Sequence, residues 1–124
     1  MDDCVFCKII KGEIPSKKVY EDDDVVVIMD IDPKVDGHSL LMPKKHVSDF
    51  TELTDDDVVM INKVVKKVGL RLVDKLKARG LTCGVNYGDS QAVKHYHLHL
   101  LPNYLLEEKS GKSVDEIYDI IKED

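Results

Sequence analysis

Residues 95–102 read "HYHLHLLP", and this stretch holds three of the five histidines of the chain. Alternate side chains of a β-strand point to the same face of a sheet. On a strand, His95, His97 and His99 would therefore share one face, and the aromatic and leucine residues between them would cover the opposite, buried face. Three interpretations are open: a solvent-facing strand that happens to use histidine, a three-histidine metal site, or a nucleophile flanked by residues with other roles. The metal interpretation is geometrically imperfect, because such side chains project nearly in parallel.

The length and composition of the chain limit the classes of protein to which it can belong. Its 124 residues suit one domain with a real core, and a formal net charge of −6 argues against a general nucleic-acid binder. The first residues, "MDDCVFCKII", show no secretory signal, and the apolar run "VVVIM" at 25–29 is too short to span a membrane. Three cysteines without such a signal indicate a reduced, cytoplasmic protein. We expect neither a nucleic-acid partner nor a membrane partner.

A long helix is predicted over 55–79. Thr54 is a good N-cap, the three aspartates that follow suit the positive end of a helix dipole, and apolar residues then recur every three or four positions up to Gly80. Shorter elements surround this helix. They are a helical turn at 4–12, two strands around an acidic turn within 17–30, strands at 37–43, 81–87 and 94–102, and a helix at 114–122.

The order of these elements predicts an α+β domain around an antiparallel sheet. Ser113 and Glu116 form a capping box that begins the last helix. We expect a single domain over 1–124, with a core at 1–103 and an acidic C-terminal tail at 104–124 that is helical at 114–122. Cys83, alone in an apolar strand, is expected in the core.

The histidine stretch fits the pattern His-φ-His-φ-His-φ-φ, in which φ is apolar or aromatic, and it resembles the histidine triad (HIT) family of nucleotide hydrolases and transferases. Further segments resemble Hint-like and bacterial members of that family. They are residues 4–33, "GHSLLMPKKH" at 37–46 and "NYGDSQAVKH" at 86–95. The resemblance spans roughly residues 4–103. It implies a HIT-like fold with a sheet of about five strands, one long helix, a short N-terminal helix and a C-terminal helical tail.

The resemblance implies different roles for the histidines. His97 would attack the α-phosphorus of a nucleotide and form a nucleotidyl–histidine intermediate, since neutral imidazole is a good nucleophile near pH 7. Its other ring N–H should then be held by an acceptor such as a backbone carbonyl. His99 would bind phosphate oxygens and assist the leaving group as a general acid. His38 would orient the triad, or it is simply a buried, hydrogen-bonded residue.

The loop before the triad would bind the phosphates. The family places Asn at the position of Asn86 and Gln at that of Gln91 near them, although Asn86 by itself indicates only an ordinary turn. The loop departs from the family pattern at two positions. Ser90 stands where Gly is common, and Ala92 stands where many Hint-like members have a hydroxyl residue, so one phosphate contact is expected to be missing.

The N-terminal segments would form the nucleoside pocket. Asp30 falls where the family holds the ribose hydroxyls, although it also suits a turn cap. Apolar residues at or beside the base-pocket positions also suit plain core packing, and a mostly apolar slot would bind a purine without strong selection. They are Val5, Phe6, Ile9, Ile28 and Ile31.

A Cys-x-x-Cys pair at Cys4 and Cys7 has several meanings by itself: a zinc knuckle, a redox pair or coincidence. In metal-bearing HIT relatives, zinc is held by this pair, by a histidine after the Pro-Lys segment and by the first triad histidine. Here those histidines are His46 and His95. Four such ligands would form a closed tetrahedral site without an open position, so the zinc would be structural. The alternative is a reduced thiol pair packed as small apolar residues.

Together the residues and the resemblance predict a nucleotide hydrolase. It would attack the α-phosphate of purine nucleotide derivatives, either phosphoramidates or dinucleoside polyphosphates, and the resemblance implies a homodimer. Two alternatives are open: a zinc-stabilised nucleotide-binding or scaffolding protein with little turnover, made credible by Ala92, and a nucleotidyltransferase.

Overall fold

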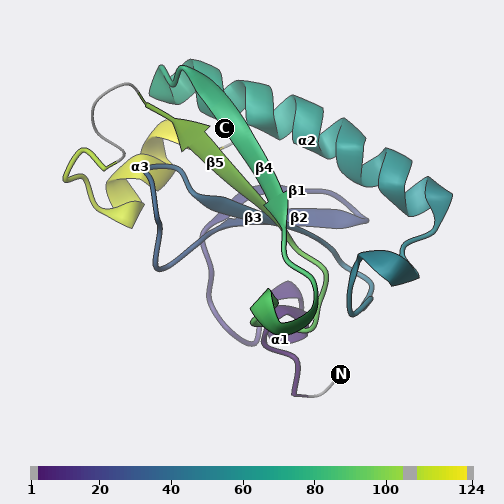
Figure 1. Ribbon diagram of the computed structural model, residues 1–124. Helices are drawn as coiled ribbons and strands as arrows, with labels where there is room; N and C mark the ends of the chain where they lie inside the picture. Colours follow the sequence, from purple (N-terminus) through teal and green to yellow (C-terminus); the bar gives the residue numbers. More distant parts are fainter. Residues whose placement is uncertain (1–2, 105–108, 123–124) are drawn as a thin grey trace.

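The computed structural model describes residues 3–104 and 109–122, and its centre is a five-stranded antiparallel sheet (Figure 1). The strands lie in the order β1-β2-β3-β5-β4. Their bounds are Lys18–Glu21 for β1, Val25–Met29 for β2, Ser39–Pro43 for β3, Gly80–Val85 for β4 and Leu98–Asn103 for β5. β5 therefore lies between β3 and β4, next to the strand that directly follows His38.

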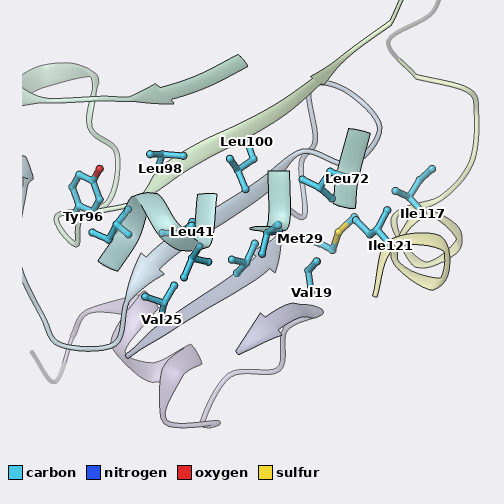
Figure 2. Close-up of a cluster of buried hydrophobic side chains, with 14 of the residues drawn as sticks. Val19, Val25, Met29, Leu41, Leu72, Tyr96, Leu98, Leu100, Ile117 and Ile121 are labelled. Carbon is cyan, nitrogen blue, oxygen red and sulfur yellow. The ribbon is translucent and has the colours of Figure 1, made fainter. Parts of the chain in front are cut away.

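Helices cover both faces of this sheet. The long helix α2, Asp55–Leu76, lies over one face, and the short helix α1, Val5–Ile10, lies on the other side (Figure 1). Two buried clusters result. The larger one fills the space under α2, and it includes Leu98 and Leu100 of β5 together with Tyr96 (Figure 2). The smaller one joins Phe6 and Ile9 of α1 to the opposite face of β2 and β3.

The start of α2 is fixed by a reciprocal cap. The Thr54 hydroxyl accepts from the backbone N–H of Asp57 at 3.1 Å, and the Asp57 carboxylate accepts from the Thr54 N–H at 2.9 Å. The helix ends at Leu76 rather than at 79, because Lys77 adopts a left-handed conformation with φ of 53°. Two residues further on, the backbone N–H of Arg79 donates to the carbonyl of Asn103, so the chain has already joined the sheet.

The predicted C-terminal helix is present as α3, Val114–Ile121, and it closes one end of the larger core. Ile117 and Ile121 are buried there, as Figure 2 shows. The Tyr118 hydroxyl donates to the carbonyl of Lys18 at 3.1 Å. The remaining part of the predicted tail includes 105–108 and 123–124, which lie outside the described residues. Over the residues the structure describes, the tail helix packs on the domain core.

Two expectations about the strands were wrong. The last strand begins at Leu98 and not at 94, so His95 and His97 precede it in an irregular segment. Cys83 is exposed and not part of the core, because β4 is the edge strand of the sheet. The remaining strands and helices agree with the predicted α+β arrangement. Within the described ranges, none of the helices has the length and apolar character needed to cross a membrane.

Candidate active site and metal centre

A cluster of two cysteines and two histidines lies where α1 meets the segment before β5. Cys4 caps the start of α1, and its sulfur accepts from the backbone N–H of Cys7 at 3.4 Å. Nδ1 of His95 lies 3.5 Å from each of the two sulfurs, and Nδ1 of His46 lies 3.3 Å from the sulfur of Cys7. The four potential ligand atoms all lie within 4.8 Å of one another.

These four side chains fit a tetrahedral metal. Ligands at about 2.3 Å for sulfur and about 2.0–2.1 Å for nitrogen around one ion are themselves separated by roughly 3.3–3.8 Å, and the three sulfur–nitrogen separations given above, 3.3–3.5 Å, lie in this range. Two thiols and two imidazoles are also the donor set that zinc prefers. Together with the short separations, this donor set makes the Cys-x-x-Cys segment part of a possible metal centre.

The ring of His95 is fully buried, and each of its two nitrogens has a partner. Nε2 donates to the carbonyl of Pro43 at 2.8 Å, which leaves Nδ1 as the unprotonated nitrogen that faces the sulfurs of Cys4 and Cys7. Burial lowers the pKa of His95, so the neutral ring is favoured. A histidine that donates from one nitrogen to a carbonyl and presents the other to a metal is the usual arrangement for a ligand.

His97 is oriented by a backbone carbonyl, as expected. Its Nδ1 donates to the carbonyl of His95 at 2.8 Å, and the Phe6 ring packs edge-on against its ring with centroids 5.0 Å apart. With the proton held on Nδ1, Nε2 of the neutral ring carries a lone pair. The residue is buried at 7% exposure, but it lines the same cavity as Asp30 and Phe6.

His38 and His99 form a directed pair. The backbone N–H of Lys34 donates to Nδ1 of His38 at 3.1 Å, so the proton of neutral His38 lies on Nε2. This Nε2 lies 2.9 Å from Nδ1 of His99 and donates to it. The proton of neutral His99 is therefore on its own Nε2. That nitrogen lies 3.4 Å from the side-chain amide nitrogen of Asn86.

Burial and charge keep this pair neutral. Burial lowers the pKa of His38, and the carboxylate of Asp30 acts in the opposite direction. Burial, followed by the charges of His97 and His38, lowers the pKa of His99 to about 4. At neutral pH the two rings are therefore uncharged hydrogen-bond donors with fixed tautomers, and His99 is a weak acid before any ligand binds.

The residues predicted for the nucleoside lie together. A cavity of about 380 Å³ opens between α1, the end of β2 and the loop before the triad, and His97 and His99 lie on its wall. Its other lining residues are mostly apolar, and they include every predicted base-pocket position. These are Val5, Phe6, Ile9, Ile28 and Ile31. Ile31 is 91% exposed at the rim, whereas Phe6, Ile9 and Ile28 also belong to the smaller core cluster.

Asp30 caps a turn and also lines the cavity, so its predicted contact with the ribose stays a prediction. Its Oδ1 accepts from the backbone N–H of Asp32 at 2.9 Å, which is a turn cap. Its Oδ2 lies 3.5 Å from Nε2 of His38, and the side chain lines the nucleoside cavity. One carboxylate thus caps a turn and faces the pocket.

The phosphate loop is only partly assembled around the triad. Asn86 is exposed and lies against His99, as described above. Gln91, in contrast, is buried at 5% exposure, and its amide nitrogen donates to the carbonyls of Ser48 at 2.7 Å and Val93 at 3.0 Å. It holds the loop in place and does not line the cavity that contains His97. A phosphate contact by Gln91 stays a prediction.

Sequence reasoning did not identify several residues of the site. Val93 lines the nucleoside cavity from the loop, and Ile14 and Ser16 line it from the segment after α1. Lys34 was also missed, although its backbone fixes the tautomer of His38. No periodic or motif signal marks these positions, because they come together only through tertiary packing.

The comparisons with known proteins agree with this geometry. The family model described as the HIT domain matches residues 11–105. An uncharacterized HIT-like protein of Methanocaldococcus jannaschii is 45% identical over 103 residues, which cover 82% of this chain and 79% of that protein. The adenylylsulfatase HINT3 of Arabidopsis thaliana is 37% identical over 103 residues, covering 82% of this chain and 52% of that protein. The chain belongs to the HIT family.

Solved structures support the same assignment. A Hit-like protein of Bartonella henselae superimposes with a TM-score of 0.89 at 31% identity, covering 98% of this chain and 96% of that chain. A zinc-bound histidine triad protein of Mycobacterium smegmatis gives a TM-score of 0.86 at 30% identity, with 98% and 91% covered. A HIT family hydrolase of Clostridium thermocellum gives 0.74 at 34% identity, with 89% and 98% covered.

Proposed function

We propose that this protein is a hydrolase of purine nucleotide conjugates that works through a nucleotidyl intermediate on His97. The observation that carries the proposal is the 2.8 Å hydrogen bond from Nδ1 of His97 to the carbonyl of His95. It leaves the lone pair of Nε2 available on the wall of an apolar cavity large enough for a nucleoside. The relatives named as an adenylylsulfatase and a HIT family hydrolase support the reaction class.

In the first step, Nε2 of His97 attacks the α-phosphorus and forms a P–N bond. The bond from phosphorus to the leaving group breaks, and its electron pair stays with the leaving group. The ring of His97 becomes cationic, and the carbonyl of His95 stabilises that charge through the Nδ1–H bond. The Nε2–H of His99 is placed to donate to a phosphate oxygen or to the leaving atom.

In the second step, water attacks the same phosphorus. The P–N bond breaks, its electron pair returns to Nε2 of His97, and a nucleoside monophosphate is released. The proton lost by water goes to solvent. His38 keeps Nδ1 of His99 occupied through both steps, so that the Nε2–H of His99 stays directed at the phosphate oxygens.

Zinc would be held by Cys4, Cys7, His46 and His95, and it would be structural. All four positions of a tetrahedral ion are filled by protein atoms, so no position is left for substrate. The zinc-bound relative of Mycobacterium smegmatis supports this choice of metal. Its role would be to tie the N-terminal segment to the residue that orients His97.

The proposal is tested with a panel of adenosine 5′-phosphoramidate, diadenosine polyphosphate and adenosine 5′-phosphosulfate. Wild type should convert at least one of them to AMP, and His97→Ala should lose turnover by at least about 10³-fold. Intact-mass spectrometry after an alkaline quench, which preserves a P–N bond, should detect a nucleotidyl adduct on wild type and none on His97→Ala. His99→Asn is the matched control, because it keeps the nucleophile and should still form the adduct. Equal turnover by wild type and His97→Ala would exclude the mechanism.

The binding or scaffolding alternative predicts a different result. Ala92 lines the cavity and offers no hydroxyl to a phosphate, which favours weak catalysis. In that case wild type would bind AMP and zinc but would form no adduct with any substrate of the panel. A nucleotidyltransferase would form the adduct and pass the nucleotide to a phosphorylated acceptor faster than to water.

We propose further that the active protein is a homodimer joined along β4. This strand is the edge of the sheet, and exposed Cys83 and Val85 lie on it. An exposed apolar edge strand is a template for pairing with a second chain. Light scattering should give twice the mass of 14.1 kDa for wild type and the single mass for Cys83→Arg. Thr82→Arg, one residue away on the opposite face of the strand, is the control.

A further inference from the structure

His99 separates two cavities of different chemistry. The nucleoside cavity, about 380 Å³, is mostly apolar. A second cavity of about 200 Å³ opens on the other flank of His99, and His99 is the residue that lines both. A phosphorus atom held between His97 and His99 would therefore direct the nucleoside into one cavity and the leaving group toward the other.

The second cavity carries polar and cationic groups. Lys34, Asn86 and His38 line it together with His99. The positive charge of Lys34 reaches both rings, since it contributes to the lowered pKa of His38 and of His99. Gly84, paired with His99 across the strands, forms an open floor, because a Cβ placed there would meet nothing within 4 Å.

We propose that this cavity receives the leaving group and that Lys34 selects leaving groups that are compact tetrahedral oxyanions, such as sulfate or phosphate, over neutral amines. This inference rests on the proposed function, whose substrate class it narrows. The volume of about 200 Å³ suits a small anion. The Lys34 ammonium and the Asn86 amide supply the attraction and the hydrogen bonds that an oxyanion requires.

The chemistry of the leaving group also favours an oxyanion over an amine. When the bond from phosphorus to a bridging oxygen breaks, the electron pair stays on an oxygen of a stable anion, and no proton is required. An amine departs only after protonation of its nitrogen. The pKa of His99, which burial and neighbouring charge lower to about 4, leaves little of the imidazolium form that could protonate the amine near neutral pH.

The test compares Lys34→Gln with wild type on three substrates: adenosine 5′-phosphosulfate, ADP and adenosine 5′-phosphoramidate. The substitution should lower kcat/KM for the two anionic leaving groups about 5-fold, the effect expected for one partly exposed ion pair, and should change the phosphoramidate less than about 2-fold. The loss should shrink toward about 1 M salt, where charges are screened within about 3 Å. Lys63→Gln, an exposed lysine on α2 behind the sheet, is the matched control.

The same experiment distinguishes sulfate from phosphate as the preferred leaving group. A loss confined to the phosphosulfate assigns sulfate as the leaving group, and a loss confined to ADP assigns phosphate. Equal changes for all three substrates, or no change for any, would overturn the role of Lys34.

A binding measurement on an inactive variant tests this inference separately from the proposed function. Calorimetry on His97→Ala measures the affinity for adenosine 5′-phosphosulfate without turnover, and adding Lys34→Gln should weaken it about 5-fold while AMP binding stays constant. A wild type without turnover but with this Lys34-dependent binding would contradict the hydrolase and retain the cavity. Turnover in wild type with no effect of Lys34→Gln on rate or binding would support the hydrolase and contradict the role of Lys34 in this cavity.

Discussion

The backbone carbonyl of His95 accepts a hydrogen bond of 2.8 Å from Nδ1 of His97, while the ring of His95 faces the sulfurs of Cys4 and Cys7. One residue thus contributes its side chain to the possible metal cluster and orients His97, the proposed nucleophile, through its backbone. A metal bound at this cluster would restrain the carbonyl that fixes the tautomer of His97. Metal content and catalysis are therefore expected to be coupled, although no substrate atom touches the metal.

Removal of one thiol should expose this coupling. Cys7→Ser should lower zinc content, measured by mass spectrometry of the metal, from one ion per chain to nearly none, because Cys7 contacts both His46 and His95. The free energy of unfolding should fall by about 2.7 kcal/mol when free zinc is at 100 times its Kd for wild type. Turnover should fall as well, since His95 loses its anchor.

Cys83→Ser is the control for this experiment, because Cys83 is an exposed cysteine away from the cluster. It should keep its zinc, because Cys83 offers no ligand to the cluster. Full zinc content in Cys7→Ser, or equal zinc loss in Cys83→Ser, would contradict the assigned ligand set.

His38 is a positioning residue, and its replacement should act through His99. It is 1% exposed and donates from Nε2 to Nδ1 of His99 at 2.9 Å. His38→Phe removes the donor, frees the tautomer of His99 and should lower kcat about 10²-fold with little change in KM. His38→Gln keeps an N–H donor in a similar place and should recover about 10-fold of that loss. Equal kcat values for the Phe and Gln variants would show that only packing matters at this position.

The low pKa of His99 predicts how stability depends on pH. A histidine whose pKa falls from 6.5 to about 4 on folding binds fewer protons in the native state than in the unfolded chain. Its contribution is complete above pH 6.5 and is lost as the pH falls toward about 4. Urea unfolding across this range should show a shallower decline for His99→Asn than for wild type. Loss of metal at low pH affects both proteins, so the difference between them isolates His99; parallel curves would contradict the shift.

The sequence predicted those parts of the fold that local chemistry determines. The cap at Thr54 and the apolar repeat placed α2 at its observed start, and the alternation around the histidines correctly predicted that Leu98 and Leu100 are buried. Family resemblance supplied the grouping of Cys4 with His95, which no spacing rule gives for residues so far apart in the chain. The structure brings them to 3.5 Å.

Other features could not be read from the sequence, because they depend on partners distant in the chain. The last strand begins late since Nε2 of His95 donates to the carbonyl of Pro43, a bond that has no local signal. Gln91 resembles a phosphate ligand by position, yet its amide donates to the backbone carbonyls of Ser48 and Val93. Cys83 is exposed because its strand is at the sheet edge, and strand order does not follow chain order.

The turn that leads into β3 is predicted to tolerate no side chain at Gly37. This glycine has φ of +85°, and a Cβ there would overlap Cδ1 of Leu76 and lie 3.2 Å from Cγ of Pro102. Gly12 has nearly the same φ, +83°, but a Cβ there would meet nothing within 4 Å. Gly12→Ala should therefore lower the free energy of unfolding by about 1 kcal/mol from backbone strain alone. Gly37→Ala should lower it by roughly 2–4 kcal/mol, because overpacking adds to the same strain. Urea unfolding of the two variants measures the difference, and equal losses would show that the contacts with Leu76 and Pro102 relax without cost.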